Sequence, residues 1–223
     1  VAAVPKGNSF VDALQFVGAI LKDQGAPYET HIHLNQGTAT AFNGVLAAGI
    51  RIAEDIWALP HNGLLIEALK KCGQNFSLVQ LDQSKLSIKN EKFKAIVPCL
   101  DPTIFNAIAP DNPVAPITDD FKIGLNAVGV LASDTGQSVI QASILMNGQS
   151  LISTNRHVVF EYWHGVDLPP GIALPKSIVQ PLAKMGKPLA KFGYSNNSAT
   201  FYFDDDSWLR TQYFAEPWPN MDK

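Results

Sequence analysis

The chain has 223 residues, of which 46% are hydrophobic and 17% charged, a composition that is typical of a soluble globular protein and excludes intrinsic disorder. The formal net charge of −3 excludes a strongly basic, conventional nucleic-acid binder. Cys72 and Cys99 are too few for a disulfide framework, so we expect reduced thiols and a cytoplasmic location. No stretch approaches about 18 consecutive apolar residues, so no membrane span is predicted.

The sequence contains an internal repeat. Two landmarks of the first half return in the same order: Phe10, Leu14 and Val17-Gly18 as Phe121, Leu125 and Val128-Gly129, 111 residues later, and Ala58-Leu59-Pro60 as Ala173-Leu174-Pro175, 115 residues later. Nearly equal offsets indicate a duplicated domain. We therefore predict two domains, residues 1–115 and 116–223, each long enough for its own core.

In the first half, Phe10, Leu14, Val17 and Leu21 have the spacing of one apolar helix face, with Ser9 at the N-cap and Gly25-Ala26-Pro27 as the stop. Apolar and polar residues alternate around His33, which predicts a strand, and residues 45–52 have a composition typical of a strand. Asn43-Gly44 is a favourable tight turn between two strands. Leu59-Pro60 leads into a second helix that ends at Gly73. Three strands follow, at 76–81, 85–88 and 93–99.

Four prolines between residues 100 and 118 predict a linker. The second half then repeats the order of elements. A helix at 121–131, capped by Thr118 or Asp119, precedes strands at 139–146, 151–154 and 158–163. The turn at Pro169-Pro170-Gly171 precedes a fourth helix near 176–185, with Pro181 close to its first turn, and strands at 190–194, 199–203 and 208–214. The predicted fold class is α+β, with antiparallel sheets backed by two helices in each unit.

Several segments resemble the bacterial DNA polymerase sliding clamp of the β-subunit type. Residues 151–159 are similar to the clamp strand that ends in an A-T-D-G-H-R-L-type signature, 171–176 to its V-I-V-P-R/K start of a helix, and 216–220 to its R-F-P-D-Y segment. Residues 93–102 resemble the end of the clamp's first domain. The resemblance spans almost the whole chain and implies tandem DNA-clamp domains.

The chain also departs from that family. Asn155-Arg156 stands where the family has Asp-Gly, which puts the chemistry of this turn in doubt, and Val158 stands where an arginine is usual. The β-type clamp has three such domains, and this sequence stops where a third would begin. Either a third domain is missing here, or three two-domain subunits close a ring, as in phage and eukaryotic clamps. Phage and bacterial origin both stay open.

The resemblance implies a processivity factor that encircles duplex DNA as a homo-oligomeric ring, without an active site, cofactor or metal. Because helices line the hole in this family, nine residues on or just after the predicted helices are the implied DNA-facing set: Lys22, Gln24, Lys70, Lys71, Lys122, Gln137, Lys184, Lys187 and Lys191. The alternative is that the lysines are solvated helix faces or charges that complement helix dipoles, and that the glutamines only fill turns.

The resemblance also implies a pocket for short peptides of DNA polymerases and clamp loaders. Its implied residues are Gln141, Thr154, Arg156, His157, Val159, Leu174 and Pro219. Such sites hold an extended peptide through a few apolar anchors. The alternative is that Val159 and Pro219 fill the core. Ring closure would use an exposed edge strand, which the sequence does not identify.

The remaining signals argue against catalysis. His31-x-His33 lacks further ligands at metal-binding spacing, so we expect surface histidines. Asp204-Asp205-Asp206 lacks the ligand spacing of a calcium loop and is predicted to be a solvated turn. Three hypotheses stay open: a ring-forming sliding clamp, a clamp-fold adaptor that binds peptides without a ring, and a hydrolase that uses His157 or His31.

Overall fold

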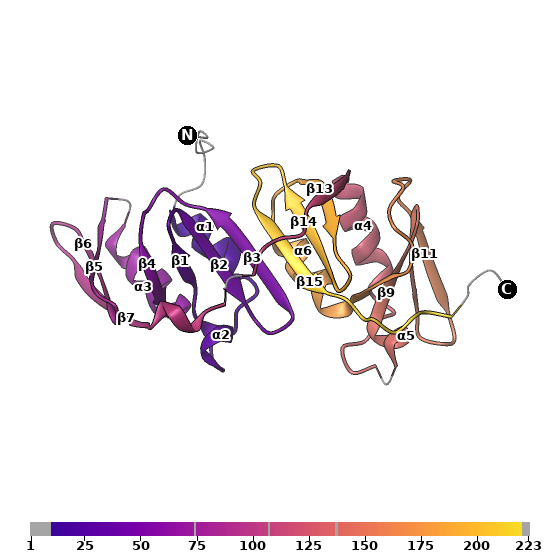
Figure 1. The fold of residues 1–223 in the computed structure, drawn as a ribbon, viewed down its shortest axis with the longest axis horizontal. Helices are drawn as coiled ribbons and strands as arrows, with labels where there is room; N and C mark the ends of the chain where they lie inside the picture. Colours follow the sequence, from indigo (N-terminus) through magenta and orange to yellow (C-terminus); the bar gives the residue numbers. More distant parts are fainter. Residues whose placement is uncertain (1–9, 74, 107, 137, 220–223) are drawn as a thin grey trace. The chain divides into compact units, whose positions relative to one another are not determined.

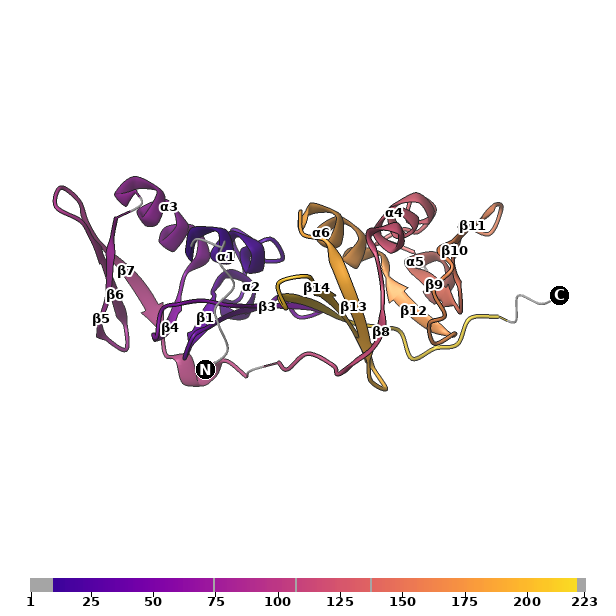
Figure 2. The same cartoon turned by 90° about the horizontal axis from the view of Figure 1, so that it is seen from above.

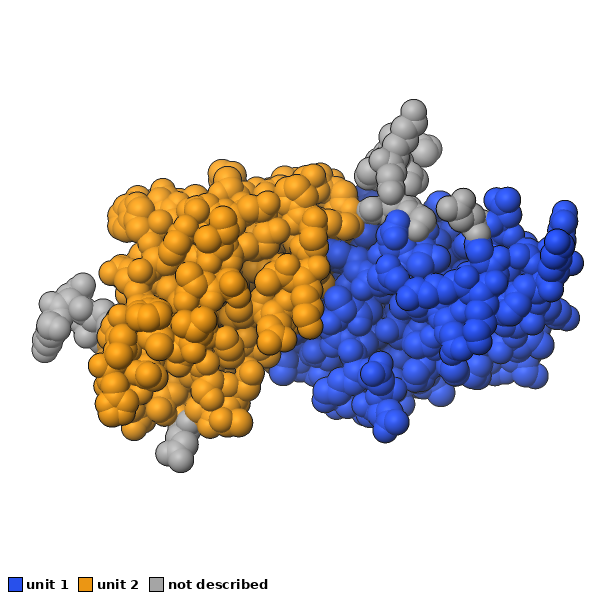
Figure 3. All heavy atoms as spheres, turned by 180° about the vertical axis from the view of Figure 1, so that it is seen from behind, with its two compact units in different colours: residues 1–109 blue, residues 110–223 orange. Residues whose placement is uncertain are grey.

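The computed structural model describes residues 10–73, 75–106, 108–136 and 138–219. The chain divides into two compact units, Val1–Ala109 and Pro110–Lys223 (Figure 3). The boundary lies earlier than the one predicted after residue 115, because strand Pro113–Pro116 pairs within the second unit. The predicted cap Ser9 lies outside the described residues.

The first unit begins with two helices, continues with four strands, and ends with a helix, three strands and a 3-10 turn. In chain order these are α1 (Phe10–Gly18), α2 (Pro27–Thr30), β1 (His33–Asn35), β2 (Thr38–Phe42), β3 (Leu46–Arg51), β4 (Trp57–Pro60), α3 (Asn62–Cys72), β5 (Ser77–Asp82), β6 (Lys85–Lys89), β7 (Lys94–Leu100) and η1 (Pro102–Ile104) (Figure 1).

All strand pairs of the first unit are antiparallel, in the order β5-β6-β7-β4-β1-β2-β3. Figure 2 shows α1 and α3 side by side on one side of these strands. Leu14 of α1, Leu34 of β1 and Leu65 of α3 have no exposed surface, so the core lies between the helix pair and the sheet. The helix end predicted at Gly73 and the tight turn predicted at Asn43-Gly44 are confirmed, and the two glycines have positive φ values, 82° and 98°.

The second unit begins with a short strand and then follows the same order. Its elements are β8 (Pro113–Pro116), α4 (Asp119–Val128), α5 (Val139–Ala142), β9 (Ser143–Asn147), β10 (Ser150–Thr154), β11 (Val159–Trp163), β12 (Ile172–Pro175), η2 (Lys176–Ile178), α6 (Val179–Lys184), β13 (Leu189–Tyr194), β14 (Ser198–Phe203) and β15 (Trp208–Gln212).

Two antiparallel groups of strands form this unit, β11-β10-β9-β12 and β15-β14-β13-β8. Helices α4 and α6 pack against each other on one side of the strands (Figure 2). Phe121 of α4 lies 5.5 Å from Phe201 of β14, ring centre to ring centre, and Phe201 lies at the same distance from Phe192 of β13. This aromatic cluster is fully buried.

The duplication that the sequence indicates is present in the fold. The order β12-β9-β10-β11 repeats β4-β1-β2-β3, and each Ala-Leu-Pro copy ends the strand that leads into the second helical segment. The α+β prediction, with antiparallel sheets and a helix pair in each unit, is confirmed.

One glycine in each repeat lets the two helices of a unit approach closely. A Cβ atom at Gly18 would lie 2.8 Å from Oδ1 of Asn62, the first residue of α3. A Cβ atom at Gly129 would lie 3.1 Å from Cγ2 of Val179, the first residue of α6, and 2.7 Å from the carbonyl oxygen of Leu125. The repeated Val-Gly landmark therefore marks the contact between the end of the first helix and the start of the second.

Some predicted boundaries are wrong. Helix α1 ends at Gly18, where the chain forms a turn in which the amide of Leu21 donates to the carbonyl of Gly18, three residues earlier. The stop predicted at Gly25-Ala26-Pro27 is instead the start of α2, where the Glu29 side chain accepts from the amide of Ala26. The predicted strand at 139–146 is a short helix, α5, followed by the strand β9.

The proline-rich segment is more than a linker, because a buried carboxylate fixes it to the second unit. Asp111 accepts hydrogen bonds from the hydroxyls of Ser198 and Thr200 and pairs with Arg210 at 3.5 Å. Strand β8 then pairs with β13. Proline is tolerated here because β8 is an edge strand.

Replacing Gly129 with alanine tests the helix contact of the second unit. We expect Gly129→Ala to destabilise the protein by about 1–3 kcal/mol, because the added methyl overlaps Val179 and a backbone oxygen. Gly186→Ala is the control, since nothing lies within 4 Å of a Cβ there. Urea unfolding measures the stability of both variants. Equal unfolding midpoints would contradict the view that the helix contact leaves no room for a side chain at Gly129.

Candidate functional site

The turn between β10 and β11 is held by its own polar side chains. The Oδ1 atom of Asn155 accepts from the amides of His157 and Val158, both at 3.0 Å. The hydroxyl of Thr154 donates to the carbonyl of Val158 at 2.7 Å and accepts from the amide of Arg156 at 3.0 Å. Arg156 has a φ of 76°, in the left-handed region that favours glycine. The turn therefore forms with Asn-Arg in the place of Asp-Gly.

A polar cluster connects this turn to helix α5. A terminal guanidinium nitrogen of Arg156 donates to the hydroxyl oxygen of Ser138 at 3.3 Å, and that hydroxyl donates to Oε1 of Gln141, also at 3.3 Å. Gln141, Thr154 and Arg156, three of the predicted peptide-site residues, are thus brought together. Ser138 was missed, because nothing in its local sequence distinguishes it from other loop serines.

The other predicted peptide-site residues have different surroundings. His157 and Pro219 are exposed, and Val159, at the start of β11, is 52% exposed. Burial of Val159 and Pro219 in the core, the alternative for these two, is therefore wrong. Leu174, in contrast, is fully buried in β12 opposite Ile144, so its side chain does not reach the surface.

Trp218 ties the C-terminal segment to the same region of the second unit. Its indole N–H donates to the hydroxyl of Ser143 at 2.9 Å, at the junction of α5 and β9, and its side chain is half-buried. Sequence reasoning passed over this tryptophan in favour of Pro219. A large aromatic residue between two prolines was the signal that could have identified it.

Strand β11 is an edge strand with an apolar surface. It pairs with β10 on one side and with no other strand among the described residues. Val158, Val159, Phe160 and Trp163 are between 43% and 67% exposed. Edge strands normally carry charges that prevent pairing with another chain, whereas Glu161 is the one charged residue of β11.

Most of the predicted DNA-facing lysines form ion pairs. Lys22 pairs with Glu29, Lys71 with Glu67, Lys122 with Asp119, Lys187 with Asp205 and Lys191 with Asp206. The hydrogen bond between the Lys22 and Glu29 side chains raises the lysine pKa and lowers the carboxyl pKa. Exposed pairs of this kind are weak because water screens them, so a phosphate can compete for Lys22, Lys71 and Lys191.

Two lysines of the second unit are fixed in structural roles. Lys122 is 16% exposed and also donates to the carbonyl of Lys187 at 2.7 Å, and Lys187 is 20% exposed. By contrast, Lys70 of α3 and Lys184 of α6 are exposed and have no ion pair among the described residues. Gln24 is exposed before α2, and Gln137 lies outside the described residues.

Solved structures share this fold. The Helicobacter pylori beta clamp bound to a DNA ligase peptide matches with a TM-score of 0.72 and 16% identity, over 95% of this chain and 66% of that one. The DNA polymerase sliding clamp of Bacillus subtilis matches with a TM-score of 0.78 and 13% identity, over 95% and 64%. A putative DNA polymerase III beta subunit of Eubacterium rectale matches with a TM-score of 0.79 and 12% identity, over the same shares.

The chain has the fold of the bacterial DNA polymerase III beta sliding clamp. It spans about two thirds of the length of those clamps. No protein-family model and no curated protein matches the sequence. The predicted resemblance is therefore confirmed by structure, at an identity that shows the clamp fold alone.

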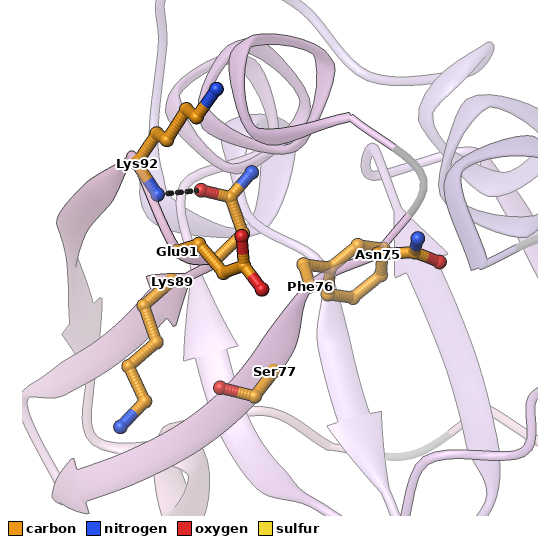
Figure 4. Close-up of a pocket in the computed structure, with 7 residues that line it drawn as sticks. Asn75, Phe76, Ser77, Lys89, Glu91 and Lys92 are labelled. Carbon is orange, nitrogen blue, oxygen red and sulfur yellow. Dashed lines mark hydrogen bonds between the residues drawn. The ribbon is translucent and has the colours of Figure 1, made fainter.

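Pockets lie among the described residues of the first unit. A pocket of about 420 Å³ between the start of α1 and the end of α3 is lined by Phe10, Asp12, Lys70 and Phe76, among others. A more open one, of about 830 Å³, lies beside the turn between β6 and β7 (Figure 4). Its Lys89 and Lys92 side chains point away from each other, so they do not form a joint anion site.

The surroundings of His31 and His33 differ from the predicted ones. No group of three or more potential ligands is present among the described residues. The expectation of a surface residue is wrong for His33, which is 5% exposed and stacks on Phe105 at 4.7 Å. His31 is half-buried against His61. Burial lowers the pKa of both His31 and His33.

Within the described part of the chain, no helix is long and apolar enough to cross a bilayer.

The buried His33 predicts a pH-dependent stability. Its folded pKa is lowered from 6.5, so as the pH falls below about 6.5 the unfolded chain binds the proton first and the free energy of unfolding decreases. We expect His33→Phe to make this free energy less dependent on pH between about pH 7 and pH 5. Urea unfolding at several pH values measures how steeply the free energy of unfolding depends on pH. His157→Phe, at an exposed position, is the control. The same slope in His33→Phe and the parent would contradict the assignment.

Proposed function

We propose that this chain is a DNA sliding clamp subunit, a processivity factor without enzymatic activity that encircles duplex DNA and tethers DNA polymerase. The observation that carries the proposal is the fold match over about 95% of the chain, with TM-scores of 0.72 to 0.79 to bacterial clamps. Because the chain has two clamp units, a closed ring needs several copies or a further domain. A cytoplasmic location follows from this role and stays a prediction.

The distribution of charge supports loose contact with DNA. A clamp holds DNA by enclosing it, so strong phosphate contacts would hinder sliding. The net charge of −3 and the many ion-paired lysines fit this requirement better than they fit a conventional DNA-binding protein. In the proposal, the helix-face lysines Lys70 and Lys184 are the main contacts, with Lys22, Lys71 and Lys191 available after their pairs open.

Peptide binding on the second unit completes the proposal. The Helicobacter pylori clamp is bound to a DNA ligase peptide, which supports short peptides as the partner class. The polar cluster of Ser138, Gln141, Thr154 and Arg156, next to the exposed Val158 and Val159, is the surface that we assign to peptides of polymerases and clamp loaders.

The exposed edge of β11 supports association of copies. Its apolar side chains and its unpaired side among the described residues would allow a strand of a second copy to extend the sheet. A head-to-tail contact of this kind closes into a ring if the rotation between copies permits it. The runner-up function, a peptide-binding adaptor, keeps the peptide surface but does not use this edge.

The topology of the DNA substrate tests the clamp function. We expect the protein to stay on closed circular DNA through gel filtration and to leave after a restriction enzyme linearises the circle. The double variant Lys70→Glu/Lys184→Glu should lower retention on circles by several-fold, because it removes cations from the helix faces. Lys92→Glu, on the turn between β6 and β7, is the matched control. Equal retention of the protein on circular and on linear DNA would contradict the clamp proposal.

The β11 edge is tested by light scattering. We expect the parent protein to form a defined oligomer, and the double variant Val159→Lys/Trp163→Lys to shift the mass toward the monomer, because edge charges oppose strand pairing. Ile104→Lys, at another exposed apolar residue, is the control. A parent that is monomeric at micromolar concentration would favour the adaptor function.

A further inference from the structure

The chain contains Asn-Gly pairs at 43–44, 62–63 and 147–148. In such a pair the backbone nitrogen of the glycine can attack the side-chain carbon Cγ of the asparagine, because glycine has no Cβ atom to hinder the approach. The attack requires an asparagine side chain that can rotate toward the backbone and a glycine amide that is accessible to water. The surroundings of each pair therefore decide whether it reacts.

The side chain of Asn43 is fixed at both ends of its amide group. Its Oδ1 atom accepts from the amides of Val45 and Leu46 at 3.1 and 2.8 Å. Its Nδ2 atom donates to the carbonyl of Ile20 at 2.9 Å. Rotation toward the nitrogen of Gly44 would break all of these bonds, so the fold protects this pair.

Asn62 is protected by the helix in which it lies. It is the first residue of α3, and its Oδ1 atom is buried, 2.8 Å from the position that a Cβ atom at Gly18 would take. Formation of a five-membered ring with the nitrogen of Gly63 would move the backbone of Asn62 out of its helical conformation. The contact between α1 and α3 therefore opposes the reaction.

Asn147 has neither kind of protection. It ends β9, directly before the turn Gly148-Gln149 into β10, and it is exposed. No hydrogen bond of its side chain, and none donated by the amide of Gly148, occurs among the described residues. Gly148 has a φ of 62°, and nothing lies within 4 Å of a Cβ atom there. Both reacting groups are thus unrestrained and open to water.

We propose that Asn147-Gly148 is a modification site at which the folded protein deamidates, with water as the co-reactant. The amide of Gly148 loses its proton to hydroxide, and its nitrogen forms a bond to Cγ of Asn147. The bond from Cγ to Nδ2 breaks, and ammonia leaves with a proton taken from water. Water then opens the cyclic imide. Its addition at Cγ gives aspartate, and its addition at the backbone carbonyl gives isoaspartate, which adds a methylene to the main chain.

The position of the pair determines the effect of each product. Both products carry a carboxylate, but only isoaspartate lengthens the main chain. The longer chain would disturb the pairing of Asn147 with Ser150 and the bond that the buried Ser150 hydroxyl donates to the carbonyl of Asn147, at 3.3 Å. Since β9 and β10 are the inner strands of their sheet, isoaspartate should lower the stability of the second unit.

The rates of reaction at the three pairs test the proposal. The full chain is incubated in mildly alkaline buffer, and peptide mapping by mass spectrometry measures the replacement of NH by O at each asparagine. We expect Asn147 to react several-fold faster than Asn43 and Asn62 in the folded protein, and the three rates to converge in urea, where the protecting bonds are lost. Equal rates in the folded protein would overturn the proposal. An unchanged ratio of rates in urea would also overturn it, because the fold would then not select the site.

Matched variants separate the chemistry from its effect. Asn147→Gln keeps an amide but would need a six-membered ring, so it should stop the modification at this turn, and an unchanged extent of modification there would contradict the assigned site. Freshly purified Asn147→Asp carries the charge without the added methylene and should unfold in urea close to the parent. The isoaspartate fraction of aged parent, isolated by chromatography, should unfold at a lower concentration. An isoaspartate fraction as stable as the parent would overturn the assigned effect on the turn.

Discussion

The close approach of two helices in each unit is the constraint on which the rest of the fold depends. In both copies a glycine ends the first helix where the second helix begins, facing Asn62 in one unit and Val179 in the other. Two helices that pack this closely cover the sheet without a void between them. This explains why the recognisable parts of the repeat are Val-Gly and Ala-Leu-Pro. The first supplies the contact, and the second carries the chain from the sheet into the helix that makes it.

Local sequence patterns were sufficient to predict those features of the fold that depend on neighbouring residues alone. The tight turn at Asn43-Gly44 and the helix end at Gly73 were predicted correctly because glycine is favoured at positive φ. The β-branched stretch at Val139 was predicted to be a strand but is helical, and its C-terminal neighbour Ser143 bonds back to the carbonyl of Val139. Strand β8 was missed because Asp111 holds it through residues nearly ninety positions away, which no local pattern shows.

The same limit explains the partial success with the candidate sites. The sequence pattern placed the lysines on or near helices, but it did not show which carboxylates pair with them. Asp205 and Asp206 were predicted only as a solvated turn, yet they neutralise Lys187 and Lys191 from another strand connection. The peptide-site residues came from a resemblance, and the structure joins those on α5 and the β10–β11 turn through Ser138, a residue that the resemblance did not supply.

The two proposed contacts of the second unit share one hairpin, and this has a thermodynamic consequence. The turn between β10 and β11 carries Arg156, and β11 itself offers the open edge. A strand that docks on β11 would lie beside the turn, so the two partners would meet on the same hairpin. Because coupling between binding events is reciprocal, any change that a docked strand makes in the affinity for a peptide would be matched by the same factor in the association of copies. Assembly and partner recruitment would then be linked through one hairpin.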